Sequence, residues 1–79
     1  MPTILRIGGY RFFFFSNEGM EPMHIHVESA EQHAKFWLQP VALASSVGYN
    51  AKELTRLRKI VEEQAAFFAE KWNEYRSTR

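Results

Sequence analysis

The chain has 79 residues and a formal net charge of +1, with 46% hydrophobic, 15% aromatic and 24% charged residues and no cysteine. A chain of this length buries one small core, which excludes a two-domain enzyme and the large dinucleotide-binding folds. The lack of cysteine excludes disulfides and thiolate metal sites, and the near-neutral charge excludes a nucleic-acid polycation.

Two strands joined by a glycine turn are predicted at the start of the chain. Residues 3–7 (TILRI) and 10–16 (YRFFFFS) are rich in apolar and aromatic side chains, and the Gly8-Gly9 pair between them is a hairpin signal. This turn places Arg6 opposite Arg11. Apolar residues fall on both faces of the hairpin, which predicts a strand pair that is covered on both sides.

A second hairpin is predicted over residues 23–28 and 33–38. The segment MHIHVE alternates apolar and polar residues with period two, and a turn at Ala30-Glu31 pairs it with HAKFWL. One face of this hairpin is apolar and is expected to face the core. The other face is polar and rich in imidazole, and it holds His24, His26, Glu28, His33, Lys35 and Trp37.

The pattern becomes helical after Asn50, which is a good N-cap with Glu53 three residues later. Apolar residues at steps of three and four predict a helix over about 51–76. The preceding residues 41–49 predict at most a short strand at 41–44, followed by a loop. We therefore expect one α+β domain over residues 1–79, an antiparallel sheet of about four strands (two hairpins) packed on one long C-terminal helix.

A single helix covers only one face of a sheet. Phe13 and Phe15 lie on the other face of the first hairpin, and exposed aromatic groups of this kind mark contacts with partners. Together with Trp37, they predict a protein interface. A second copy of the chain, or residues 41–49 folded over this face, are the alternatives.

Arg6 opposite Arg11 is a conflict, because like charges directly across a ladder destabilise it. An acceptor is expected nearby, from Glu18 or Glu21, from a partner or from a phosphate. Adjacent guanidinium groups bind phosphate well. With Lys35, the two arginines predict an anion or nucleic-acid binding site.

His24 and His26 lie on the same face of one strand. Imidazole exchanges protons near neutral pH, which makes both residues candidate acid–base catalysts. A metal site formed by His24, His26 and Glu28 is an alternative, and a plain contact surface is another. We expect no bound metal and no cofactor, because so few ligands in the open bind weakly.

No apolar run approaches the roughly 18 residues of a membrane helix, and the first residues lack the pattern of a signal peptide. These observations predict a soluble cytoplasmic protein.

Taken together, MPTILRIGGYRFFFFSNE, EPMHIHVE, AKFWLQPVALASSVGYNAKEL and the final WNEY resemble the small bacterial domain-of-unknown-function family 4160, over nearly the whole chain. The resemblance implies a neighbouring gene for a small protein of domain-of-unknown-function family 2442, with which members are proposed to form toxin–antitoxin pairs. It implies no agreed reaction. The positions that match the family's pattern are Arg6, Gly8, Tyr10, Arg11, Glu21, Pro22, His24, His26, Lys35, Trp37 and Trp72.

The resemblance therefore implies a component of a type II toxin–antitoxin module, and we expect the toxin rather than the antitoxin. It would bind the protein encoded by the neighbouring gene through the aromatic sheet face and act on RNA or another phosphate-bearing target. One alternative is a non-enzymatic protein- or DNA-binding module, with the helix residues Lys52, Arg56 and Lys59 touching phosphates. Another is a small metalloprotein with a His-x-His strand. Whether the protein is an enzyme, and whether it forms a homodimer, stay open at this point.

Overall fold

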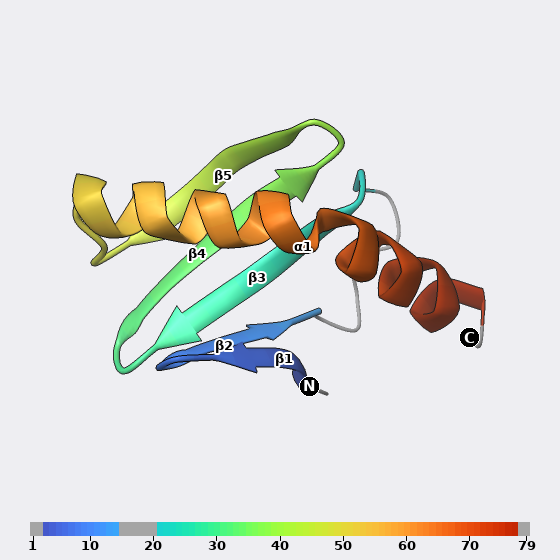
Figure 1. Cartoon of the computed structure of the whole chain (residues 1–79), viewed down its shortest axis with the longest axis horizontal. Helices are drawn as coiled ribbons and strands as arrows, with labels where there is room; N and C mark the ends of the chain where they lie inside the picture. Colours follow the sequence, from blue (N-terminus) through green and yellow to red (C-terminus); the bar gives the residue numbers. More distant parts are fainter. Residues whose placement is uncertain (1–2, 15–20, 78–79) are drawn as a thin grey trace.

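The computed structural model describes residues 3–14 and 21–77. Its elements, in chain order, are β1 (Thr3–Ile7), β2 (Tyr10–Phe13), β3 (His24–Ser29), β4 (Gln32–Leu38), β5 (Val41–Val47) and α1 (Ala51–Ser77). The strands form one antiparallel sheet in the order β1-β2-β3-β4-β5, and α1 crosses one face of it (Figure 1). The α+β prediction is confirmed, with five strands rather than about four.

The first hairpin forms around the two glycines as predicted, and Arg6 lies opposite Arg11. Further from the turn the register shifts, so that Thr3 takes the place opposite Phe13 that simple pairing gives to Ile4. The ladder of β2 ends at Phe13, earlier than the predicted end at residue 16. Positions 15 and 16 lie outside the described residues.

The second hairpin has the predicted register throughout. A two-residue turn at Ala30-Glu31 fixes which residues face each other, and period-two alternation then fixes the two faces. The pairs are His24 with Trp37, His26 with Lys35, and Glu28 with His33.

The fifth strand was only partly predicted. Val41–Val47 pairs with β4 from end to end except at Ala44, where the register shifts, so the loop expected after residue 44 is instead the second half of a strand. This strand extends the sheet at its edge, and it does not fold over the second face, which corrects that alternative. After it the chain turns at Gly48 (φ +92°), where a side chain would come within 2.7 Å of Gln32.

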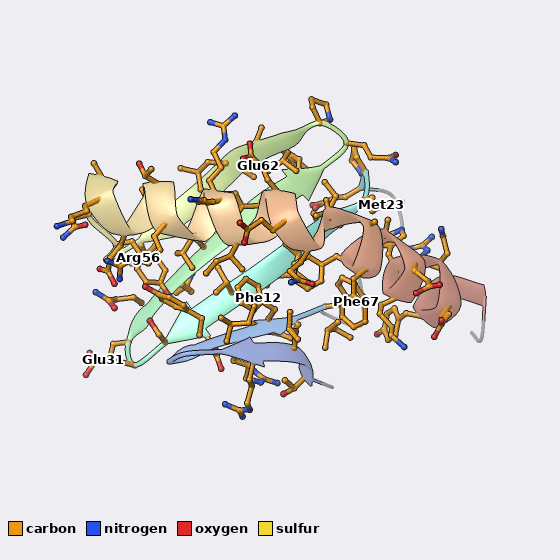
Figure 2. The ribbon with its side chains drawn as sticks, in the orientation of Figure 1. Phe12, Met23, Glu31, Arg56, Glu62 and Phe67 are labelled. Atoms are coloured by element: carbon orange, nitrogen blue, oxygen red, sulfur yellow. The ribbon has the colours of Figure 1, made fainter. Side chains whose placement is uncertain are left out.

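The helix begins at the predicted cap, where the Glu53 amide donates to Asn50 Oδ1 at 2.8 Å. Its apolar stripe packs on the sheet, and Phe68 lies with its ring centroid 5.4 Å from that of Phe12. Figure 2 shows Phe12 between the sheet and the helix. No helix in the described part of the chain is long and apolar enough to cross a membrane. The buried core consists of Phe12, Phe14, Ile25, Val27, Ala34, Phe36, Leu38, Tyr49, Leu57, Val61, Phe68 and Trp72.

Candidate functional site

The face of the sheet opposite α1, here called the open face, carries most of the sequence-predicted site residues. The observed register brings side chains from all five strands of the described sheet onto one surface, because side chains alternate between the two faces of a sheet. By strand alternation the open face comprises Arg6, Arg11, Phe13, His24, His26, Glu28, His33, Lys35, Trp37, Ser45 and Val47.

Arg11 is held by neighbours on both sides. Its Nη1 donates to Glu28 Oε2 at 2.8 Å, and its Nε donates to Thr3 Oγ1 at 2.7 Å. The expected acceptor is therefore Glu28 on the adjacent strand β3, rather than Glu21, and Glu18 lies outside the described residues. Arg6 is exposed and forms no ion pair with any described residue, so it is the more accessible of the two arginines.

Lys35 lies at the middle of β4 with its side chain only 18% exposed. Its ammonium pairs with the Glu21 carboxylate, and Nζ also lies 4.7 Å from the centroid of the Trp37 ring. A lysine held over an indole in this way gains a cation–π attraction. The structure thus brings Lys35 and Trp37 together, which the sequence had assigned to separate roles.

Phe13 lies on the open face as predicted but is only 5% exposed. The Arg11 guanidinium lies 4.5 Å from its ring centroid, and the His26 ring stacks on it at 5.6 Å. We had expected another chain or residues 41–49 to cover this ring. It is covered instead by side chains of its own chain, while Phe15 lies outside the described residues.

His24 has no exposed surface and lies where the open face meets the helix. Its ring contacts Trp37 at 5.7 Å and Trp72 of α1 at 5.0 Å. Its Nδ1 lies 2.7 Å from the Pro22 carbonyl oxygen, which only accepts hydrogen bonds, so Nδ1 carries the proton. A substrate on the surface cannot reach this imidazole.

A pocket of about 380 Å³ lies in the open face over the β3–β4 hairpin. His26 and His33 both line it, from opposite strands of the hairpin. His26 lies opposite Lys35 and His33 opposite Glu28, so the two imidazoles are diagonal neighbours on one face. The whole lining consists of Phe13, His26, Glu28, Ala30, Glu31, Gln32, His33, Ala34, Lys35 and Ser45.

His33 lies on the polar face of the second hairpin as predicted, although no sequence signal indicated a role of its own. Its pairing with Glu28 was already predicted, and that register puts it diagonal to His26. The predicted register therefore already placed His26 and His33 close together across two strands. The His24-Ile25-His26 spacing instead led to a prediction of two imidazoles on one strand.

The predicted metal ligands are not assembled into a site. In the described part of the chain, no three His, Asp or Glu side chains are grouped so that they could hold a metal ion. His24 is buried against tryptophans, and Glu28 is engaged with Arg11.

Away from the pocket, Tyr49 is a buried polar group near the start of the helix. Its hydroxyl oxygen lies 2.9 Å from Ser29 Oγ, and burial raises the pKa of the phenol above its ordinary value of 10.0. The ring also lies edge-on to Tyr10, with centroids 6.2 Å apart. Tyr49 therefore anchors the end of the second hairpin to the turn before α1.

A comparison with protein families identifies the family of the chain. The model of the family described as Domain of unknown function (DUF4160) matches residues 9–73, which include all of β2 to β5 and most of α1. The pocket and all of its lining residues fall within this range. No curated protein and no solved structure matches the chain.

Proposed function

The chain belongs to the family described as Domain of unknown function (DUF4160), and we propose that it is the toxin of a type II toxin–antitoxin module that cleaves RNA in the pocket of its open face. The observation that carries this proposal is the diagonal pair of imidazoles, His26 and His33, in a pocket that also holds Lys35.

The spacing of the imidazoles suits a phosphodiester. Diagonal neighbours on one face of an antiparallel pair are about 7–8 Å apart. A phosphate between them is within reach of both rings, and imidazole is the side chain that best exchanges protons near neutral pH. His26 and His33 therefore support acid–base catalysis together, with His33 in the role that the sequence had given to His24.

Lys35 supplies positive charge at the same place. An ammonium group has three donors, so Lys35 can keep its contact with Glu21 and still donate to a phosphate oxygen. Because the Glu21 side chain is 46% exposed, the pair is also weak enough to exchange. Arg11 and Arg6 extend the cationic surface from β4 across to β1.

The reaction that fits these groups is transesterification of RNA. One imidazole removes the proton of a 2′-hydroxyl as its oxygen bonds to phosphorus, and the other donates a proton to the 5′-oxygen as the phosphorus–oxygen bond to it breaks. The products are a 2′,3′-cyclic phosphate and a free 5′-hydroxyl. Each acid–base group contributes about 10²–10⁴-fold to a rate.

The partner is proposed to be the small protein encoded by the neighbouring gene, bound over the open face. Trp37 is only partly buried and lies beside Lys35, so a protein seated there would cover both the indole and the pocket's cation. Binding at this place would inhibit the toxin by closing the pocket.

The test is expression of the chain alone and together with the neighbouring gene, combined with cleavage of labelled single-stranded RNA by the purified protein. We expect growth arrest that the neighbouring gene relieves, and loss of about 100-fold or more in cleavage rate for His26→Ala and for His33→Ala. Glu63→Ala on the exposed side of α1 is the matched control. A folded His26→Ala/His33→Ala variant that still arrests growth as strongly as the parent would exclude the acid–base role.

A second candidate function is a nucleic-acid binding module without catalysis. Lys52, Arg56 and Lys59 are all exposed on α1, and none forms an ion pair with a described residue. Such a surface contacts phosphates through charge alone, so binding falls steeply with salt. Salt-dependent binding of RNA or DNA without cleavage, lost in a Lys52→Glu/Arg56→Glu/Lys59→Glu variant, would favour this function.

A further inference from the structure

The two edges of the sheet differ in how they are protected. In the described part of the chain, β1 and β5 are the edge strands. Each of β1 to β4 carries at least one charged residue, whereas β5 (VALASSV) carries none. Natural edge strands are usually blunted by charges, because an open edge pairs with other strands.

The exposed hydrophobic side chains are found on this same strand. Among the described residues, the large apolar side chains with high exposure are Leu43 at 41% and Val47 at 55%. An uncharged edge strand that also exposes apolar residues favours pairing with a strand of another chain.

The backbone of β5 has groups available for such pairing. The Leu38 amide donates to the carbonyl oxygen of Met23, the residue just before β3, so the pair of Leu38 with Val41 is one that does not exchange hydrogen bonds. By the alternation of antiparallel ladders, Val41 and Leu43 direct their NH and C=O groups away from β4, and so does Ser46 beyond the register shift at Ala44. The Val41 carbonyl receives a long contact from Arg58 at 3.5 Å, which leaves the middle of the edge for another strand.

We propose that β5 pairs antiparallel with β5 of a second copy, forming a two-fold dimer with one continuous sheet. This inference stands apart from the proposed RNA cleavage. Edge-to-edge pairing of this kind has its two-fold axis normal to the sheet, so both helices lie on one side and both open faces on the other. Because β5 carries no charged residue, pairing of β5 with β5 of a second copy places no like charges opposite each other.

The charges beside this edge favour a second copy over an unrelated partner. Arg58 and Glu62 form an i,i+4 pair on α1, with Arg58 Nε 3.4 Å from Glu62 Oε2. Arg58 reaches Val41 of β5, and Figure 2 shows Glu62 projecting from the helix toward the β5 side. With the two-fold axis between these two positions, each Arg58 faces the other copy's Glu62, so this part of the surface is complementary to itself.

The first test is the mass of the full chain in solution, by sedimentation or light scattering over a range of concentrations. We expect twice the chain mass of 9.3 kDa at high concentration. Leu43→Lys should raise the dimer dissociation constant on the order of tenfold or more, because two apolar contacts are lost and two like charges meet near the axis. Gly9→Lys, in the exposed turn of the hairpin at the opposite edge, is the matched control. A monomer at all concentrations, or a dimer insensitive to Leu43→Lys, overturns the proposal.

The second test uses charge reversal and does not depend on changing the strand. Arg58→Glu and Glu62→Arg should each weaken self-association, because like charges then face each other across the axis. An equimolar mixture of the two variants should associate as strongly as the parent, since each copy then presents the opposite charges. Failure of the mixture to associate better than either variant alone overturns the arrangement.

Hydrogen exchange gives an independent readout of strand pairing. The amides of Leu43 and Ser46 should exchange more slowly as protein concentration rises, whereas those of Ala42 and Val47, which face β4, should not change. Protection at Leu43 and Ser46 that is independent of concentration contradicts pairing between copies.

Discussion

The two faces of the sheet are buried by different means. On the helix-covered face, Phe12 is fully buried because a separate element, α1, places Phe68 against it. On the open face, Phe13 is almost as buried, but its cover includes the Arg11 guanidinium and the His26 ring from its own sheet. Adjacent residues of one strand therefore reach nearly the same burial through apolar packing in one case and polar cover in the other.

The two kinds of cover differ in how easily they rearrange. Apolar packing between two elements is close-packed and tolerates little change. Charged side chains lying flat over aromatic rings keep contact with water and can move aside for a ligand. The open face thus combines a pocket with aromatic rings that lie under polar side chains, so these rings are not a bare hydrophobic patch.

The largest expected effect is on the helix-covered face. Phe12→Ala removes a ring that no flexible side chain can replace, and it should lower the free energy of unfolding by about 3–5 kcal/mol. Urea denaturation followed by far-UV circular dichroism measures the loss. A stability close to that of the parent would mean that α1 does not hold the core through Phe12.

The matched change on the open face should have a smaller effect. Phe13→Ala is expected to lower the free energy of unfolding by less than the loss of about 3–5 kcal/mol expected for Phe12→Ala, because Arg11 and His26 can collapse onto the space. The same denaturation experiment gives the comparison. Equal losses for Phe12→Ala and Phe13→Ala would show that the polar cover is as rigid as the core.

Replacing Tyr49 tests the hydrogen bond between its hydroxyl and Ser29. Tyr49→Phe should cost about 1 kcal/mol at neutral pH through loss of the hydrogen bond with Ser29. Since burial raises the pKa of Tyr49 in the folded state, its contribution is full below the unfolded value of about 10 and is lost as pH rises through the folded pKa. The free energy of unfolding should therefore fall less steeply above about pH 10 in the variant than in the parent. Identical slopes would contradict the assignment.

The smallest effect is expected for the ion pair of the open face. Glu28→Gln should lower the free energy of unfolding by less than about 1 kcal/mol, since the Glu28 side chain is 44% exposed. The difference from the parent should shrink at high salt, where charges are screened. Glu31→Gln, exposed at the tip of the same hairpin, is the control and should show no such salt dependence. A salt-independent loss at Glu28 would point to packing rather than charge.

Much of the fold could be predicted because its signals are local. The Gly8-Gly9 and Ala30-Glu31 turns fix the register of their hairpins, and the Asn50 cap with its apolar stripe fixes the helix. The strand Val41–Val47 was largely missed because Ala and Ser are weak strand formers and its residues do not alternate. It is a strand because β4 lies beside it, and no window of its own sequence contains that information.

The candidate site likewise has some features set by local sequence and others set by contacts between distant segments. Sequence alone determined that imidazoles, a lysine and a tryptophan share one face of the second hairpin, since strand alternation requires nothing beyond the turn. Only the tertiary structure decided which of them are accessible. Trp72, near the end of α1, covers the ring of His24. The pairing of β2 with β3 brings Arg11 beside Glu28, and the two form an ion pair. Burial and ion pairing depend on contacts between distant segments, and these contacts arise only when the helix and the two hairpins pack together.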